Sequence, residues 1–308
     1  MAKKVLIAIV GPTGIGKTRL GVALAKRHNT QVISADSRQF YKGMSIGTAV
    51  PSKAELEAVP HHFIQHKSIL EDYSVGDFER DAILLLERLF EHNGVVVMVG
   101  GSGLYVDAVI NGLDSFPDID PKVRLRLNEA LQTHGLPPLQ EQLRKLDPEY
   151  AEKVDLQNPH RVIRALEVCL GTGGRYSSFL GKKKPPRPFE TMIVGLTADR
   201  KTIYERIDDR VDQMLGQGLL EEARPLFPLR EKNALQTVGY KEIFLFLEGV
   251  YDLDFAVSEI KKNSRRFAKR QLTWFKKREG VIWLDAMDPV EKNVETVTEK
   301  LLKIFKNG

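Results

Sequence analysis

The chain has 308 residues, of which 42% are apolar and 28% are charged, a composition typical of a globular protein with a sizeable core. Its net charge of +5 permits a polyanionic partner but does not require one, and its single cysteine, Cys169, excludes an internal disulfide and a multi-cysteine zinc site. No apolar run approaches the roughly 18 residues of a membrane span, so we expect a cytoplasmic protein without a membrane partner.

The first predicted element is a buried strand over 5–10, which leads into Gly-Pro-Thr-Gly-Ile-Gly-Lys-Thr and then into a helix over 19–26. This is the full G-x-x-x-x-G-K-[ST] pattern between a strand and a helix. Its backbone amides and lysine bind phosphate, and its threonine hydroxyl ligates Mg²⁺. We therefore expect Mg²⁺ as a cofactor at Thr18. The predicted phosphate-binding residues are Gly11, Pro12, Thr13, Gly14, Ile15, Gly16, Lys17 and Thr18.

A second strand is predicted over 31–36 and ends on an acid, Asp36. The carboxyl ends of parallel strands meet at one edge of a sheet, so this carboxylate is expected beside the bound phosphates. It is interpreted as a general base or a metal partner. The alternative is that Asp36 only caps the turn that begins at Ser37.

A capping box at 74–77 predicts the start of the next long helix, and an apolar strand follows over 95–99. Most NTP-hydrolysing proteins of this class carry an acid at the end of an inner strand. Here the strand runs instead into Gly-Gly-Ser-Gly, which disfavours an ATPase. Ser102 is expected either to cap the following helix or to contact a substrate.

The alternation of strands and helices over 1–116 predicts a P-loop-containing, doubly wound α/β fold with a mainly parallel sheet. Residues 117–188 are predicted to form an inserted all-helical domain, which closes with an exposed linker over 181–188. The helices expected there cover 122–134, 138–146 and 159–171. Residues 189–308 are predicted to be the second part of the core, with strands over 191–196 and 281–284 and basic C-terminal helices.

Two basic segments of the second part of the core have open interpretations. Arg206 and Arg210 are four residues apart on one helix, where solvated salt bridges are the default expectation. Over 264–278 aromatic residues alternate with five or more cations. This pattern is typical of a nucleic-acid contact, and equally of the charged outer face of a core helix.

Taken together, these segments resemble the tRNA dimethylallyltransferase (IPP transferase) family in its bacterial form. The matching stretches, in family order, are 11–18, 34–44, 46–49, 99–105, 159–168, 238–242 and 268–275. The chain departs at Ser102, where the family usually has Thr, and at Asn158-Pro159-His160, where Pro-Asn-Asp is common. A single cysteine does not fit the zinc-finger tail of the eukaryotic relatives, so the resemblance implies the bacterial form.

The resemblance implies transfer of a dimethylallyl group from dimethylallyl diphosphate to N6 of adenosine 37 in tRNA, with release of pyrophosphate. The phosphate loop then binds this diphosphate rather than ATP. Asp36 is implied as the general base. Lys17 and Arg210 are implied to stabilise the leaving group, and Thr13 and Ser102 to position the reactants.

The partner implied is the tRNA anticodon stem-loop, with the helical insertion as a clamp on the stem. A monomer is expected because the sequence shows neither a heptad pattern nor an exposed apolar stripe. The residues expected to contact tRNA are Asp36, Ser37, Arg38, Gln39, Ser102, Arg124, His160, Arg161, Val162, Ile163, Arg164, Gly239, Lys241, Lys269 and Arg270. One alternative is a P-loop kinase or NTPase acting on a nucleoside or a small metabolite. A third interpretation is an RNA-binding protein that uses the loop only to hold an anion.

Overall fold

A computed structural model describes residues 3–182 and 184–306 of the chain. The described residues form a six-stranded sheet in the order β3-β2-β4-β1-β5-β6, with parallel pairing throughout. The strands are β1 (Val5–Val10), β2 (Val32–Ser34), β3 (His61–His62), β4 (Val95–Val99), β5 (Glu190–Thr197) and β6 (Ile282–Asp285). The predicted α/β fold with a mainly parallel sheet is confirmed.

The sheet and most helices belong to one compact unit, which comprises the chain up to Asn111 and from Arg187 onward. Its helices are α1 (Lys17–Arg27), α2 (Lys53–Ala58), α3 (Val75–Leu89), α4 (Gly103–Asn111), α9 (Arg200–Gly216), α10 (Leu219–Ala223), α11 (Tyr240–Leu247), α12 (Leu253–Lys276) and α13 (Val290–Lys306). Short 3₁₀ turns cover Arg224–Leu229 and Asn233–Leu235.

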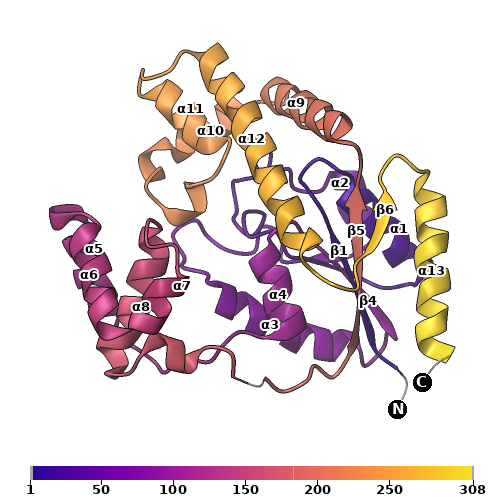
Figure 1. The fold of residues 1–308 in the computed structure, drawn as a ribbon. Helices are drawn as coiled ribbons and strands as arrows, with labels where there is room; N and C mark the ends of the chain where they lie inside the picture. The colour runs from indigo at the N-terminus through magenta and orange to yellow at the C-terminus, as the bar shows by residue number, and fades with distance from the viewer. Residues whose placement is uncertain (1–2, 183, 307–308) are drawn as a thin grey trace. The chain divides into compact units, whose positions relative to one another are not determined.

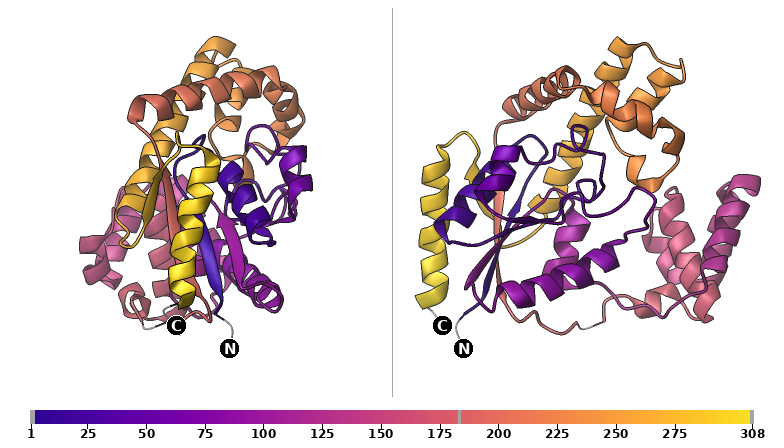
Figure 2. Two further views of the ribbon diagram at one scale, coloured as in Figure 1. Left: turned by 90° about the vertical axis from the view of Figure 1, so that its right-hand side faces the viewer. Right: turned by 180° about the vertical axis from the view of Figure 1, so that it is seen from behind.

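Both faces of the sheet are covered, because alternate side chains of each strand point to opposite sides. In β1, Leu6, Ala8 and Val10 join the core cluster that includes α3 and α4, whereas Val5, Ile7 and Ile9 join the cluster that includes α1 and α13. Figure 1 shows α3 and α4 on one side of the sheet and α13 on the other. Helices α1 and α13 lie side by side (Figure 2).

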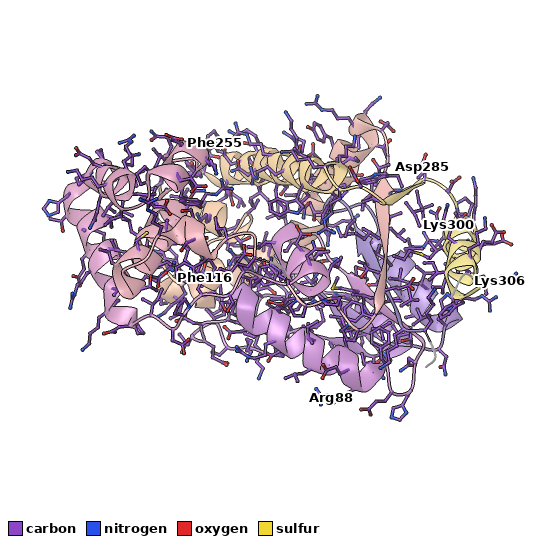
Figure 3. All side chains as sticks on the ribbon, turned by 60° about the horizontal axis from the view of Figure 1, so that its bottom comes forward. Arg88, Phe116, Phe255, Asp285, Lys300 and Lys306 are labelled. Atoms are coloured by element: carbon purple, nitrogen blue, oxygen red, sulfur yellow. The ribbon has the colours of Figure 1, made fainter. Side chains whose placement is uncertain are left out.

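Helix α13 shows how the amphipathic pattern of the sequence becomes a layer of the fold. Val297 and Leu301 are buried, and Lys300 and Lys306 extend from the outer side of the helix (Figure 3). Apolar residues four apart lie on one face of a helix, and burying that face against α1 stabilises it. None of the described helices is both long and apolar enough to cross a membrane.

The second compact unit, Gly112–Pro186, contains helices and connecting loops but no strand among its described residues. It contains α5 (Pro121–His134), α6 (Pro137–Leu146), α7 (Pro148–Lys153), α8 (Pro159–Thr172) and the 3₁₀ turn η1 (Tyr176–Phe179). Lys184 Nζ donates a hydrogen bond to the carbonyl of Gly112, 2.9 Å away, so the two ends of this unit lie together. The insertion was expected over 117–188; residue 183 of its closing linker lies outside the described residues.

Helix α7 was not predicted from the sequence. It has six residues, too few to show helical periodicity, and Asp147 begins it by accepting a hydrogen bond from the amide of Tyr150. The core of this unit includes Leu127, Leu143 and Leu166.

Candidate active site

The loop between β1 and α1 has a backbone that only glycine tolerates at its start. Gly11 has a φ of +142°, and a Cβ there would lie 2.6 Å from the carbonyl oxygen of Leu196 in β5. The loop ends at Gly16, φ +103°, directly before Lys17 and Thr18, which open α1. The N-terminus of α1 therefore presents free amides and the positive end of the helix dipole to the loop. This arrangement suits an anion such as a diphosphate.

Lys17, Asp36 and Arg210 form a charged cluster beside this loop. Burial lowers the pKa of Lys17 to about 8, while the nearby Asp36 raises it and Arg210 lowers it. Burial also lowers the pKa of Arg210, which Asp36 partly restores. Two cations thus surround one carboxylate, and Lys17 Nζ donates to the carbonyl of Pro12 in the same loop, 2.7 Å away. The surplus positive charge favours an anionic ligand.

The prediction that Arg206 and Arg210 form solvated salt bridges is wrong. Within the described part of the chain, neither guanidinium pairs with a carboxylate; Arg206 Nη1 donates instead to the carbonyl of Ile15, 3.4 Å away. The reason is that α9 lies beside the phosphate loop, with Ile207 only 3.5 Å from where a Cβ of Gly14 would be. Figure 1 shows α9 beyond the carboxyl end of β5.

Two adjoining cavities open at this edge of the sheet, and all of their lining residues belong to the first unit. The first, of about 890 Å³, is lined by the phosphate loop, Asp36, Arg206 and Arg210. The second, of about 510 Å³, is lined on its far side by α11 and α12. The residues that line both cavities are Thr13, Asp36, Thr48, Ala49, Gly101, Arg210 and Met214. Asp36 therefore lies at the junction of the cavity lined by the phosphate loop and the second cavity.

Asp36 caps a turn and faces the cavities at the same time. Its Oδ1 accepts a hydrogen bond from the amide of Arg38 at 3.0 Å. Among the residues that the structure describes, none donates to Oδ2. The cap fixes the side-chain rotamer and leaves one carboxylate oxygen for a ligand, so the two interpretations drawn from the sequence are compatible.

Ser102 directly precedes α4, and its carbonyl accepts from the amides of Tyr105 and Val106, as expected of a residue that begins a helix. Its side chain instead contacts the turn after β2. Its Oγ accepts from the amide of Ser37 at 3.2 Å and lies 3.3 Å from Ser37 Oγ. Gly100, two residues before Ser102, allows the two segments to approach, because a Cβ there would lie 2.5 Å from the carbonyl oxygen of Ala35. Ser102 and Ser37 both line the second cavity.

Gln271 of α12 was not predicted as a site residue. Its Oε1 accepts from the amide of Thr13 at 2.9 Å, and its Nε2 donates to the carbonyl of Gly101 at 3.0 Å. Only 6% of the residue is exposed. The signal that could have revealed it is an uncharged amide in step with the buried Ala268 and Phe275, on a helix otherwise rich in cations.

Replacing Gln271 with Leu is expected to weaken the binding of inorganic pyrophosphate and to lower the melting temperature. The substitution keeps the side-chain volume but leaves the amide of Thr13 and the carbonyl of Gly101 without partners, at about 1–3 kcal/mol for each buried group. Calorimetric titration and thermal unfolding measure the two effects. The exposed Gln132 on α5 provides the control, Gln132→Leu. Wild-type binding and stability in Gln271→Leu would contradict the prediction.

Gln39 was expected to contact tRNA, and the structure is inconsistent with that role. Its side-chain amide is fully engaged inside the protein: Oε1 accepts from Ser34 Oγ at 3.0 Å, and Nε2 donates to the carbonyls of Thr48 and Ala49 at 3.2 and 2.9 Å. Only 9% of the residue is exposed. Gln39 therefore holds the loop that forms the wall between the two cavities.

The other predicted contact residues of the first unit surround the second cavity or lie close to it. Arg38, Gly239, Lys241 and Arg270 line it. Lys269 and Arg270 are exposed on α12 and, within the described residues, neither pairs with a carboxylate. The structure agrees with a core helix that has a charged outer face, because Phe275 is fully buried while cations cover that face, and the nucleic-acid contact stays a prediction.

In the second unit the structure separates the predicted contact residues into two groups. His160 and Arg161 are exposed at the start of α8. Arg124 and Arg164 pair with Glu167 at 3.0 and 2.9 Å, so part of their charge is neutralised within the unit. Val162 and Ile163 belong to the core of the unit, with exposed fractions of 0% and 3%. Their burial is inconsistent with the predicted tRNA contact, because the inner face of α8 packs against its neighbours.

Comparison with known proteins agrees with this geometry. A model of the IPP transferase family matches residues 39–278. A tRNA dimethylallyltransferase of Christiangramia forsetii is 58% identical over 94% of this chain and 95% of its own length. One of Flavobacterium psychrophilum is 54% identical over 96% of this chain and 98% of its own.

Solved structures show the same relationship. The tRNA isopentenylpyrophosphate transferase of Bacillus halodurans is 39% identical and superposes with a TM-score of 0.74, covering 99% of this chain and 98% of that one. A eukaryotic dimethylallyltransferase, solved in snapshots of the enzyme acting on tRNA, is 30% identical with a TM-score of 0.78, covering 93% and 75%. The chain belongs to the IPP transferase family.

Proposed function

We propose that this chain transfers the dimethylallyl group of dimethylallyl diphosphate to N6 of adenosine 37 in tRNA and releases pyrophosphate. The observation that carries the proposal is the junction of two cavities at Asp36, with a phosphate loop in one and exposed cations around the other. The names of the relatives support the reaction, and the eukaryotic structure supports tRNA as the acceptor.

The first cavity takes the diphosphate. The C1–O bond of the allylic substrate breaks, and its electron pair leaves with pyrophosphate, so negative charge grows on the leaving group. The amides of the loop and the cations of Lys17 and Arg210 stabilise this charge more strongly in the transition state than in the ground state. The observation that supports these roles is the cluster of both cations beside the N-terminus of α1.

Asp36 accepts the proton that the attacking amine must lose. The lone pair of N6 is delocalised into adenine, so removing a proton while the N6–C1 bond forms assists the attack, by about 10²–10⁴ in rate. The free Oδ2 of Asp36 and its place between the cavities support this role. Thr13 and Ser102, which line the second cavity, position the adenine. C1 of the allylic substrate gains positive charge as the bond to the diphosphate breaks, and water could attack it in place of the amine. The reacting groups therefore meet between the two cavities, where water is excluded.

Mg²⁺ fits the donors present without a protein cage of its own. Among the described residues no group of three His, Cys, Asp or Glu side chains could hold a metal ion. Mg²⁺ commonly binds one or two protein oxygens together with substrate phosphates, and Thr18 and Asp36 line the same cavity. When bound there, the ion neutralises charge on the diphosphate.

One chain is sufficient for the proposed reaction, because every group invoked in the chemistry comes from the first unit of a single chain. Bases in single-stranded RNA loops are accessible to such a site, whereas paired bases are not.

The test incubates the protein with Mg²⁺, radiolabelled dimethylallyl diphosphate and unmodified tRNA that has adenosine 37. Label in acid-precipitable RNA is the expected result. Hydrolysis of ATP in a parallel reaction, without label in RNA, would instead favour the kinase or NTPase.

Replacing Arg161 with Ala is expected to weaken tRNA binding and to flatten its salt dependence. Each cation that neutralises a phosphate releases counterions, so losing one such contact reduces the slope of log K against log salt by about 1. Filter binding at several salt concentrations measures this. Arg144→Ala removes an equally exposed arginine of the same unit and serves as the control. A wild-type slope for Arg161→Ala removes this arginine from the interface.

A further inference from the structure

Trp274 of α12 is held in one orientation by residues of α4. Its indole Nε1 donates to Asp107 Oδ2 at 3.0 Å, and Asp107 Oδ1 forms an ion pair with Arg278. The pyrrole edge of the indole lies directly over Gly103, where any Cβ would collide with it. Asp107 and Gly103 together fix the ring before any ligand arrives.

The orientation is unusual because much of this large side chain is left in solvent. Trp274 is 43% exposed, whereas the next residue, Phe275, is fully buried. A tryptophan that served only to pack the helix would bury its ring, since burying aromatic area stabilises the fold. Trp274 instead lines the second cavity, which it shares with Asp36.

The surroundings of the ring indicate the chemistry of its ligand. The indole N–H is already donated to Asp107, so the ring offers a flat aromatic surface and no free polar group. Phe267 and Arg270 lie on the same helical face at spacings of seven and four residues, and both line the same cavity. The guanidinium of Arg270 lies over the ring of Phe267, and among the described residues it has no carboxylate partner. A fixed aromatic surface beside such a cation is the pattern on which nucleobases of single-stranded RNA stack.

We infer that Trp274 is a stacking surface for a nucleobase of the bound RNA that neighbours the acceptor adenosine. The inference rests on the proposed function, because it takes the second cavity as the entrance for the RNA loop. Stacking needs only the face of a base, so this contact orders the loop without reading its sequence. Asp107 is a positioning residue for the ring and Trp274 is the binding residue.

The first test compares Trp274→Leu with Trp274→Phe. The probe is an RNA hairpin with the anticodon stem and loop and an adenosine at position 37. Leu is apolar but smaller and has no π surface, so the dissociation constant of the Leu variant is expected to rise by about tenfold. Phe retains stacking and is expected to stay close to the wild type. Equal losses for Leu and Phe, or no loss for Leu, would overturn the inference.

The second test needs no change at Trp274. The chain has two tryptophans, and Trp283, which packs against Gly195 in the sheet, is the other. In Trp283→Phe the hairpin is expected to quench the remaining fluorescence, that of Trp274, in proportion to binding. In Trp274→Phe the hairpin is expected to leave the fluorescence of Trp283 unchanged. Binding without quenching in Trp283→Phe would overturn the inference even if the Leu variant failed to fold.

Two controls separate this inference from the proposed function. Affinity for inorganic pyrophosphate, which binds in the other cavity, is expected to be unchanged in Trp274→Leu, and this also reports a folded protein. If the wild type labels RNA while Trp274→Leu binds the hairpin normally, only the stacking role fails. If the wild type neither binds nor labels RNA, the proposed function fails and the inference fails with it.

Discussion

Replacing Asp36 with Asn is expected to lower turnover by about 10² or more while tRNA binding is retained. The substitution removes the negative charge that accepts the N6 proton. It keeps an amide oxygen in the place of Oδ1, which accepts the hydrogen bond from Arg38. The loss is therefore chemical rather than structural. Single-turnover incorporation of label into tRNA, at saturating concentrations of both substrates, measures it.

The neighbouring lysine requires a control in this experiment. Asp36 raises the pKa of Lys17, so its removal lowers that pKa further and reduces the cationic fraction near neutral pH. The comparison is therefore made below pH 7, where a larger fraction of Lys17 is protonated in both proteins. Asp36→Ala, which also removes the cap on the turn, separates the contribution of the cap. Unchanged turnover in Asp36→Asn under these conditions would contradict the assignment of the base.

The parts of the site that sequence reasoning found are those whose chemistry is local. The phosphate loop is one continuous stretch between a strand and a helix, and Asp36 ends the next strand, so a parallel sheet brings them together. The helices of the insertion were predicted because their apolar residues recur at helical spacing. In each case the signal lies within about fifteen residues of the chain, which is the length that a pattern can span.

The missed parts depend on contacts between residues far apart in the sequence. Gln271 bridges Thr13 and Gly101, which are more than 150 residues away in the chain. Glu222 is a second case: its carboxylate accepts the amides of Ser45, Ile46 and Gly47 and the hydroxyl of Tyr240, and so it anchors the loop that lines both cavities. A single side chain whose partners lie far away in the chain produces no periodic pattern in the sequence around it.

The errors have a related cause. Val162 and Ile163 were expected at the tRNA interface because they lie between cations in a stretch that resembles the family, yet they form the inner face of α8. A matching stretch includes residues that hold the helix in place as well as residues that bind. Gln39 shows the same effect, since it lies beside Asp36 in sequence but holds a loop. Burial, which no single sequence displays directly, separates the two kinds of residue.

Replacing Lys17 with Met is expected to weaken diphosphate binding and to lower turnover by about 10²–10³, the usual cost of removing one group that stabilises a developing negative charge.

Because the pKa of Lys17 is lowered to about 8, wild-type affinity for inorganic pyrophosphate is also expected to fall as the pH rises above about 8. The direction follows from linkage: the ligand prefers protonated Lys17, so losing that proton from the free protein weakens binding, by up to about tenfold per pH unit.

Calorimetric titration in metal-free buffer between pH 6.5 and 9.5 tests this dependence. Pyrophosphate itself ionises in that range, and dividing the wild-type affinity by that of Lys17→Arg at each pH cancels the ionisation, since arginine stays charged. The ratio is expected to fall above pH 8. In Asp36→Asn the fall is expected to begin at a lower pH, because a nearby negative charge that raises the pKa of Lys17 has been removed. A ratio that stays constant with pH would contradict the lowered pKa of Lys17. A fall that begins at the same pH in Asp36→Asn would contradict the influence of Asp36 on the pKa of Lys17.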